Sequence, residues 1–207
     1  MDEAIVAEAR AAVGPEVELM VDAGGSDAHW PHGYKWAIHA ARMLANYDVR
    51  WFEEALRPDD LEGYRKLTEH SPVPIAAGEV LTRRQSFLEW IERRAVDYIQ
   101  PDVTKVGGIS DQHRIGQYAD DHSILMVPHG WNTGVGLAAD LQLVAAAHNA
   151  RWVEFMTPAP YIELMFEELP RLDDRGFLAI PDGPGLGFTW SADGIAKLTR
   201  GLALTGV

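Results

Sequence analysis

Apolar and polar positions form blocks along the chain, and the blocks follow a regular order. Six short segments are rich in Val, Ile, Phe, Tyr and Trp: VELMVD (17–22), VRWFEE (49–54), PIAAGE (74–79), YIQPD (98–102), ILMVPH (124–129) and WVEF (152–155). Such segments are typical of strands buried on both faces of a parallel sheet. Between them, apolar residues recur at helical spacing, as in 34–46 and 135–147. The pattern predicts a repeated strand–helix unit.

Each of these segments ends in a carboxylate or a histidine. The six residues are Asp22, Glu53, Glu79, Asp102, His129 and Glu154, with gaps of 31, 26, 23, 27 and 25 residues. One parallel β/α unit takes roughly 30 residues, and in a (β/α) barrel every strand points its carboxyl end at one shared mouth. We therefore expect an α/β fold of the TIM-barrel type, with these side chains gathered at one site.

The length of the chain limits this picture. A complete barrel of this type needs about 250 residues, whereas the chain has 207. The chain starts with a helical stretch at 3–13 that leads directly into the segment ending at Asp22. We therefore expect an incomplete barrel of about six units over residues 1–187, without its first strands, followed by a peripheral segment at 188–207.

Composition excludes several classes of function. The net charge of −13 disfavours nucleic acids and anionic membranes as partners, because phosphate binding needs clustered Lys and Arg. No apolar run approaches the ~20 residues of a membrane span, and the acidic N-terminus does not resemble a signal peptide. The absence of cysteine excludes disulfides and thiolate chemistry. These features predict a cytoplasmic protein with a small-molecule substrate.

Asp22, Glu53 and Glu79 end three consecutive predicted strands. Three carboxylates facing one another across a barrel mouth form the hard oxygen donor set that Mg²⁺ prefers. A bound cation also removes the repulsion between them. The three residues are therefore candidate Mg²⁺ ligands. The alternative is that each acid caps the next helix or faces solvent.

Asp102 and His129 end the next two predicted strands. A carboxylate bonded to one imidazole nitrogen fixes the tautomer and raises the basicity of the other nitrogen, which suits a general acid or base. His129 and Asp102 are therefore candidate catalytic residues, although a lone histidine after an apolar run is often structural. Glu154 is a third candidate, since a protonated Glu there would donate a hydrogen bond to a substrate carboxylate.

Two loops contain candidate substrate-binding groups. His29 and His32 lie in the long loop after the first predicted strand, where polar groups would meet substrate hydroxyls. Trp131 and Asn132 follow His129 and lead into a helix N-terminus, which offers amide groups and an indole face to a polar ligand. The alternative for the first loop is that its side chains are simply solvated.

Six motifs resemble the barrel of the enolase superfamily, in its mandelate racemase subgroup. They are VDAGG (21–25), WFEEAL (51–56), PIAAGE (74–79), QPDVTKVGG (100–108), VPHGWNTG (127–134) and PDGPGLG (181–187). By position, the resemblance makes Asp22, Glu53 and Glu79 the Mg²⁺ ligands, Asp102 and His129 the catalytic dyad, and Glu154 the acid near the substrate carboxylate. It also makes Lys105 a structural residue or a neighbour of the site residues rather than a base, because the muconate-lactonizing branch has its lysine at position 102.

The resemblance implies a reaction that begins with removal of a proton α to a carboxylate, giving an enediolate stabilised by the metal. Members with this HGWNTG variant include sugar-acid dehydratases. We therefore expect a Mg²⁺-dependent lyase of a hydroxylated carboxylic acid. The alternatives are a sugar-acid cycloisomerase or epimerase of the same superfamily, and a catalytically inactive fragment that needs a partner chain.

The chain departs from the family pattern in several places. The N-terminal capping domain and the lysine pair opposite the histidine have no counterpart in this sequence, so two-base racemisation is not expected. Gly24 stands where the family commonly has Asn, and Ala55 stands where it usually has Pro. An incomplete sheet also exposes strand edges, which favour association. We therefore expect a homo-oligomer, or association with an N-terminal portion.

Overall fold

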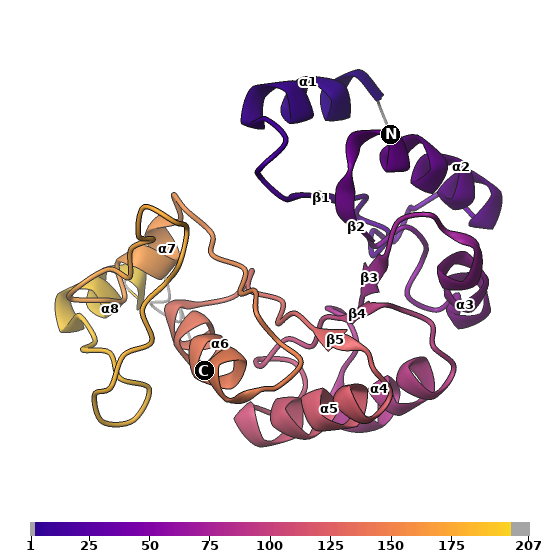
Figure 1. Ribbon diagram of the computed structural model, residues 1–207. Coiled ribbons are helices and arrows are strands. Elements are labelled where there is room, and N and C mark those ends of the chain that lie inside the picture. The colour runs from indigo at the N-terminus through magenta and orange to yellow at the C-terminus, as the bar shows by residue number, and fades with distance from the viewer. Residues whose placement is uncertain (1–2, 200–207) are drawn as a thin grey trace.

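The computed structural model describes residues 3–199, which form a curved parallel sheet with helices on its outer side (Figure 1). The strands are β1 (Leu19–Asp22), β2 (Val49–Glu53), β3 (Ile75–Ala77), β4 (Tyr98–Ile99) and β5 (Leu125–Met126). The helices are α1 (Glu3–Val13), α2 (Tyr34–Leu44), the 3₁₀ turn η1 (Ala45–Tyr47), α3 (Leu61–His70), α4 (Arg83–Glu92), α5 (Ile109–Asp121), α6 (Gly134–Ala146), α7 (Pro160–Glu163) and α8 (Ala192–Thr199). None of these helices is long and apolar enough to cross a membrane.

The strands pair in chain order, β1-β2-β3-β4-β5, and every pair is parallel. A helix lies between each strand and the next, so the expected repeat of strand and helix is confirmed. The sheet bends, and the curve stays open between α1 and the part of the chain that contains α7 and α8 (Figure 1). The fold is therefore α/β, with the architecture of a partial barrel.

The prediction of a sixth strand at 152–155 is wrong. The chain pairs with β5 only at one parallel bridge, between Met126 and Ala150, where the Met126 amide donates to the Asn149 carbonyl at 2.9 Å. In a parallel ladder the next bond on this side would come from residue 128, which is Pro128 and has no N–H. The ladder therefore stops after one step, and residues 151–155 run beside β5 without strand structure.

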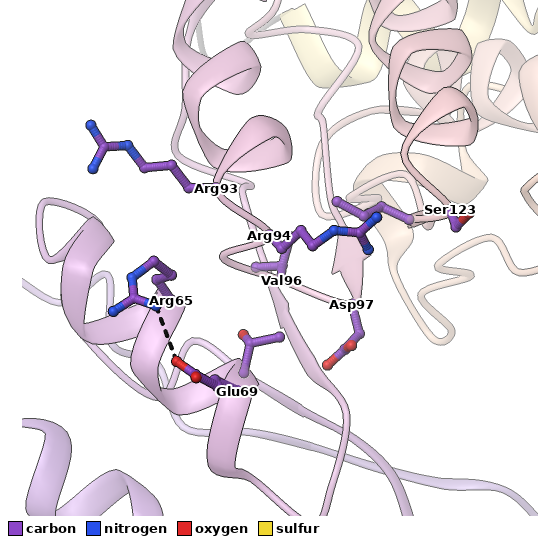
Figure 2. A pocket seen from close by; sticks show the side chains of 9 residues that line it. Arg65, Glu69, Arg93, Arg94, Val96, Asp97 and Ser123 are labelled. Atoms are coloured by element: carbon purple, nitrogen blue, oxygen red, sulfur yellow. Dashed lines mark hydrogen bonds and ion pairs between the residues drawn. The ribbon is translucent and has the colours of Figure 1, made fainter.

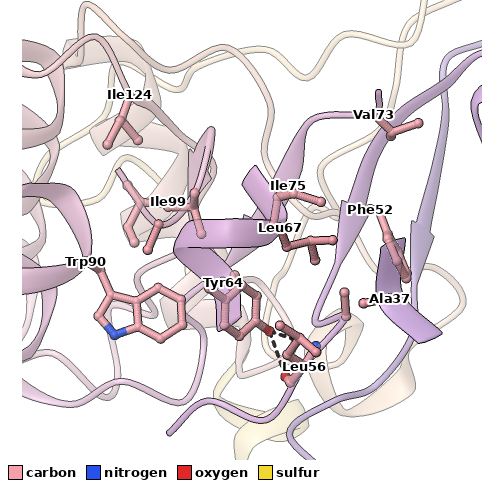
Figure 3. Close-up of a cluster of buried hydrophobic side chains, with 14 of the residues drawn as sticks. Ala37, Phe52, Leu56, Tyr64, Leu67, Val73, Ile75, Trp90, Ile99 and Ile124 are labelled. Carbon is pink, nitrogen blue, oxygen red and sulfur yellow. Dashed lines mark hydrogen bonds between the residues drawn. The ribbon is translucent and has the colours of Figure 1, made fainter. Parts of the chain in front are cut away.

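Successive strand residues point to opposite faces of the sheet, as the period of two requires. On the outer face Phe52, Ile75, Ile99 and Met126 belong to the main core, which also includes buried residues of α2 to α5 (Figure 3). The outer face is therefore the one that holds the helices.

The inner face carries a separate cluster built around Trp51, Tyr98 and Val127, with Trp152 packed against it. The ring centroids of Trp51 and Tyr98 are 5.0 Å apart, and those of Trp51 and Trp152 are 5.8 Å apart. Large side chains fill the inside of a barrel in this way, so it is a packed core rather than a channel. Glu53 is two residues beyond Trp51 and therefore points to the same inner side.

A second apolar cluster forms around α6 and α7. Phe166 packs there against Phe188 and Trp190, with ring centroids 5.0 and 5.3 Å apart. The domain boundary expected at residue 187 stays a prediction, and residues 200–207 of the predicted peripheral segment lie outside the described residues.

Candidate active site

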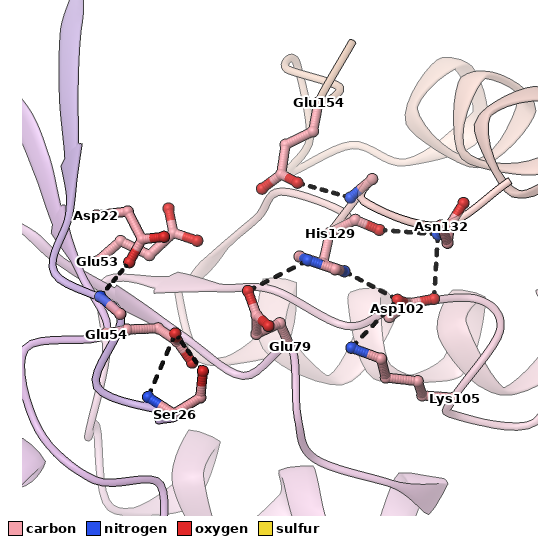
Figure 4. A network of polar contacts seen from close by, with 12 residues as sticks. Asp22, Ser26, Glu53, Glu54, Glu79, Asp102, Lys105, His129, Asn132 and Glu154 are labelled. Atoms are coloured by element: carbon pink, nitrogen blue, oxygen red, sulfur yellow. Dashed lines mark hydrogen bonds and ion pairs between the residues drawn. The ribbon is translucent and has the colours of Figure 1, made fainter. Parts of the chain in front are cut away.

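The candidate residues lie at the carboxyl ends of neighbouring strands, and Figure 4 shows them facing one another. Asp22 and Glu53 are the last residues of β1 and β2 and are paired in register. Glu79 follows β3, while Asp102 and His129 follow β4 and β5 by three residues each. The sheet therefore places these five side chains at one mouth.

His129 lies between two carboxylates. Its Nδ1 atom is 2.8 Å from Oδ2 of Asp102, and its Nε2 atom is 3.2 Å from Oε2 of Glu79. The residue is only 6% exposed. Burial lowers its pKa, but the hydrogen bond to Asp102 and the charges of Glu154 and Glu79 outweigh burial, so the pKa is raised above its ordinary value. Both ring nitrogens therefore have a carboxylate partner, and Nε2 is the nitrogen directed into the mouth.

Asp102 is fully buried and hydrogen-bonded at both oxygens. Oδ1 accepts from the Thr104 amide at 2.8 Å, the Thr104 hydroxyl at 2.6 Å and the Asn132 amide at 3.2 Å. Burial raises the pKa of Asp102, yet the hydrogen bonds from His129 and Thr104 hold it well below its usual range. Lys105 Nζ lies 3.5 Å from Oδ2. An ionised Asp102 fixes the tautomer of His129.

Glu154 reaches the same mouth from the segment after β5. Its Oε2 atom accepts a hydrogen bond from the Gly130 amide at 2.7 Å. The backbones approach so closely that a Cβ on Gly130 would overlap the Glu154 carbonyl oxygen. Burial raises the pKa of Glu154 and the Gly130 bond opposes it. A Glu with a raised pKa is able to carry a proton, which is what a donor to a substrate carboxylate requires.

The three predicted metal ligands each bind a donor of the protein. Asp22 Oδ1 accepts from the Gly24 amide at 2.8 Å, Glu53 Oε2 accepts from the Trp51 indole at 2.9 Å, and Glu79 faces His129. Within residues 3–199, no group of three or more His, Asp or Glu side chains is arranged so that it could hold a metal ion. The acids therefore share the mouth but do not form a ready-made cage, and their role as ligands stays a prediction.

The chemistry of this donor set nevertheless fits a divalent cation. Burial raises the pKa of Glu53 to about 7, although the hydrogen bond from Trp51 opposes this shift. The charges of Glu154 and Asp22 raise the pKa further. A cation bound among these oxygens would relieve the repulsion. The excess of carboxylates around Glu53 is thus the structural observation that suits Mg²⁺.

Sequence reasoning missed Glu54, which lies directly after the candidate ligand Glu53. Glu54 is 4% exposed, and its Oε2 atom accepts a 2.7 Å bond from the Ser26 hydroxyl. Burial raises the pKa of Glu54 to about 7, opposed by the Ser26 hydroxyl and reinforced by the charges of Glu79 and Asp22. Its carbonyl also accepts from the Gly25 amide at 2.8 Å. Glu54 therefore fastens the loop after β1 to the end of β2.

Replacement of Gly25 by Ala tests this contact. A Cβ at Gly25 would overlap the carbonyl oxygens of Glu54 and Leu56, both backbone atoms that cannot rotate away. We expect the free energy of unfolding, measured in urea, to fall by about 1–3 kcal/mol through overpacking. Gly33→Ala is the matched control, because a Cβ there meets open space at an ordinary φ. Equal stability of the two variants would contradict the close approach.

The four predicted substrate-binding residues lie in different settings. His32 stacks on Trp36 with ring centroids 4.3 Å apart, and the backbone amide of His29 donates to Asp27 at 2.7 Å. Trp131 is 68% exposed. Asn132 donates to Asp102 at 3.2 Å and to the His129 carbonyl at 3.3 Å. The structure thus brings Asn132 to Asp102 and His129, and binding of substrate by the four residues stays a prediction.

A cavity of about 330 Å³ lies at the opposite end of the sheet, beside residues that precede β4 and β5 (Figure 2). Three arginines line it: Arg65, which is 3.0 Å from Glu69, Arg93, which follows α4 and is 2.8 Å from Glu89, and Arg94. Two of the three positive charges are therefore paired with carboxylates, and the cavity lies away from the candidate catalytic groups.

Known proteins share both the sequence and the fold. The model of the enolase C-terminal domain-like family matches residues 1–194. The chain is 33% identical to the D-galactarolactone cycloisomerase of Agrobacterium fabrum, over 95% of the chain and 53% of that protein. It is 35% identical to the arabinonate dehydratase of Saccharolobus solfataricus, over 87% of the chain and 47% of that protein. The chain thus spans about half the length of these relatives.

Solved structures agree with the sequence matches. An enolase from Bradyrhizobium, solved with magnesium and mandelic acid, matches with a TM-score of 0.79 and 32% identity, covering 95% of this chain and 50% of that one. Other matching structures are described as mandelate racemase/muconate lactonizing enzymes.

The fold and the residues at its mouth define an α/β-barrel domain of the enolase type. The chain belongs to the enolase C-terminal domain-like family, within the group of mandelate racemase and muconate lactonizing enzymes, and the resemblance found in its motifs is confirmed. Its relatives include sugar-acid dehydratases and a cycloisomerase.

Proposed function

We propose that this domain catalyses the dehydration of a hydroxylated carboxylic acid of the sugar-acid class. The observation that carries the proposal is the position of His129, whose Nδ1 is bonded to the buried Asp102 while its Nε2 points to Glu79 at the mouth. An imidazole held in one tautomer beside a fixed carboxylate is suited to take up a proton and return it.

Each of three residues has its own task in this reaction. His129 accepts the proton α to the substrate carboxylate at Nε2 and then protonates the β-hydroxyl, which leaves as water. Asp102 keeps Nδ1 protonated and stabilises the imidazolium that forms. Glu154, with its raised pKa, donates a hydrogen bond to a carboxylate oxygen of the substrate. One base on one face of the substrate is sufficient for this syn elimination.

The α-proton of a carboxylate is too weakly acidic for a side-chain base alone, so developing negative charge needs a fixed positive centre. In our proposal Asp22, Glu53 and Glu79 hold a Mg²⁺ ion, which supplies that charge as a Lewis acid when bound. The hard oxygen donors, the repulsion around Glu53 and a relative's structure that contains magnesium support this assignment.

A cycloisomerase or epimerase of a sugar acid is the second candidate, because the Agrobacterium relative is a cycloisomerase. Both reactions begin with removal of the same α-proton, and they differ in the fate of the enediolate. A domain that is inactive without a partner chain is the third possibility.

A panel of aldonic and aldaric acids in D₂O, with and without Mg²⁺, separates these functions. We expect one acid to give a keto-acid product that carries deuterium, only in the presence of Mg²⁺. Metal-dependent deuterium uptake with an isomerised product would favour the cycloisomerase. Absence of exchange with every acid would contradict activity of this chain by itself.

We further propose that the open side of the sheet is covered by a second copy of the chain or by an N-terminal portion of the barrel. In the described part of the chain, β1 pairs only with β2, and the segment after β5 forms a single bridge. Unpaired parallel edges favour association. Sedimentation should show a species larger than the 22.9 kDa monomer, and a monomer at every concentration would contradict self-association.

A further inference from the structure

A buried polar pair lies directly behind the catalytic residues and has no part in the chemistry described above. Asp140 belongs to α6 and Gln112 belongs to α5, and both side chains are fully buried. Nε2 of Gln112 donates to Oδ1 of Asp140 at 3.1 Å. A fully buried acid in the middle of the mostly apolar α6 requires a reason, since unpaired buried charges are costly.

The pair is connected to the backbone of both catalytic residues through one carbonyl. Nε2 of Gln112 also contacts the Pro101 carbonyl oxygen at 3.2 Å, and the same oxygen accepts the His129 amide at 3.2 Å. Pro101 directly precedes Asp102. The side chain of Gln112 thus supports the point where the loop after β4 meets the loop after β5.

Two oxygens of this pair have no hydrogen-bond partner. Oδ2 of Asp140 and Oε1 of Gln112 are both buried acceptors without a donor. An ionised carboxylate is a pure acceptor and leaves both atoms unsatisfied, whereas a carboxylic acid has an O–H to donate. A proton on Asp140 would give the pair the donor it lacks, on a side chain already bonded to Gln112.

The surrounding charges favour the same form. The negative charges of Asp102 and Glu154 act on Asp140, and only the imidazole of His129 opposes them. From α5, the neighbour of Asp140 is the neutral Gln112. Burial raises the pKa of Asp140 to about 8, opposed by the bond from Gln112 and reinforced by Asp102 and Glu154.

We propose that Asp140 is present as a neutral carboxylic acid paired with Gln112, and that this pair is a positioning device for Asp102 and His129. The positioning role rests on the proposed function, whereas the protonation state does not. Neutral Asp140 adds no second carboxylate charge behind Asp102, and the acid–amide pair holds the Pro101 carbonyl that orients the His129 backbone.

The protonation state is tested by stability as a function of pH. Between the ordinary pKa of Asp and a pH of about 8, Asp140 would keep its proton in the native state, whereas the unfolded chain has released it. The native state therefore loses stability as the pH rises through this range. Asp140→Asn replaces the O–H by an N–H and has no proton to lose. Between pH 5 and 7, we therefore expect the ratio of the native chain's unfolding equilibrium constant to that of the variant to rise about tenfold per pH unit. An equal pH dependence of stability in the native chain and the variant would overturn the proposal that Asp140 is neutral.

The positioning role is tested by NMR of the His129 Nδ1 proton, which needs neither metal nor substrate. We expect Asp140→Asn to keep the native downfield signal, because Asn offers the same donor and acceptor to Gln112, and Asp140→Leu to shift or broaden it. Leu141→Ala, on the same helix but outside the polar pair, controls for general loosening and should keep the signal. An unchanged signal in Asp140→Leu, or its loss in Asp140→Asn, would overturn the role.

Activity then separates the two proposals. If the native chain exchanges the α-proton, Asp140→Asn should retain the rate and Asp140→Leu should lower kcat with little change in KM. If no acid is exchanged by the native chain, the proposed function fails, while the pH curves and the NMR signal still decide the state and role of Asp140.

Discussion

Replacement of His129 by Asn lowers the rate of Mg²⁺-dependent α-proton exchange by about 10²–10⁴-fold, the usual contribution of a general base. The reason is geometric, because His129 is the imidazole that is bonded to the buried Asp102 and directed into the mouth. The measurement is the initial rate of deuterium incorporation into the acid that the native enzyme accepts.

His148→Asn is the matched control for this experiment. The His148 side chain is 93% exposed and lies outside the network at the mouth, so this variant should keep the native rate. Retention of more than a tenth of the rate in His129→Asn, with native circular dichroism, would assign proton transfer to another group.

Replacement of Glu53 by Gln abolishes the rise in melting temperature that Mg²⁺ gives the native chain, and lowers activity by about 10³-fold, since Lewis-acid stabilisation is worth several kcal/mol. Without metal, the variant should melt no lower than the native chain. The buried carboxylate beside Asp22 and Glu154 becomes neutral, and the Gln oxygen still accepts the Trp51 indole proton.

Glu69→Gln serves as control, because this acid lies on the exposed side of α3 and pairs with Arg65. It should keep the full Mg²⁺-dependent shift. A native shift in Glu53→Gln would remove Glu53 from the set of metal ligands.

The sequence was sufficient to predict the five parallel strands and the proximity of Asp102 to His129. Strands buried on both faces show as continuous apolar runs, and the regular spacing of Asp102 and His129 after two such runs predicted their contact of 2.8 Å. The prediction of a sixth strand was wrong because residues 152–155 have the composition of a strand, but the neighbouring segment after β5 lacks the amide hydrogen that would continue the ladder. Pro128 was visible in the sequence, and its missing N–H is the signal that would have corrected the prediction.

The remaining features depend on tertiary contacts that no local pattern encodes. The bond between Glu79 and His129 depends on how two side chains turn within the mouth. Glu54 was not singled out because the pattern pointed to its neighbour Glu53, and only the structure shows that Glu54 accepts a hydrogen bond from Ser26. Asp140 is visible in the sequence as the one charged residue of the mostly apolar stretch GLAADLQLVAA, whereas no pattern marks its partner Gln112.

The indole of Trp152 donates to Glu18 at 3.0 Å, although 134 residues separate them in the chain. Contacts of such long sequence separation carry a large loop-closure cost and slow folding. Trp152 lies two residues before Glu154, and Glu18 lies four residues before Asp22, so the first and last segments that supply residues to the mouth come together only when this span closes. During synthesis and refolding, we therefore expect the pocket to acquire its working geometry as one of the last events, after the helices and the central strands have already formed.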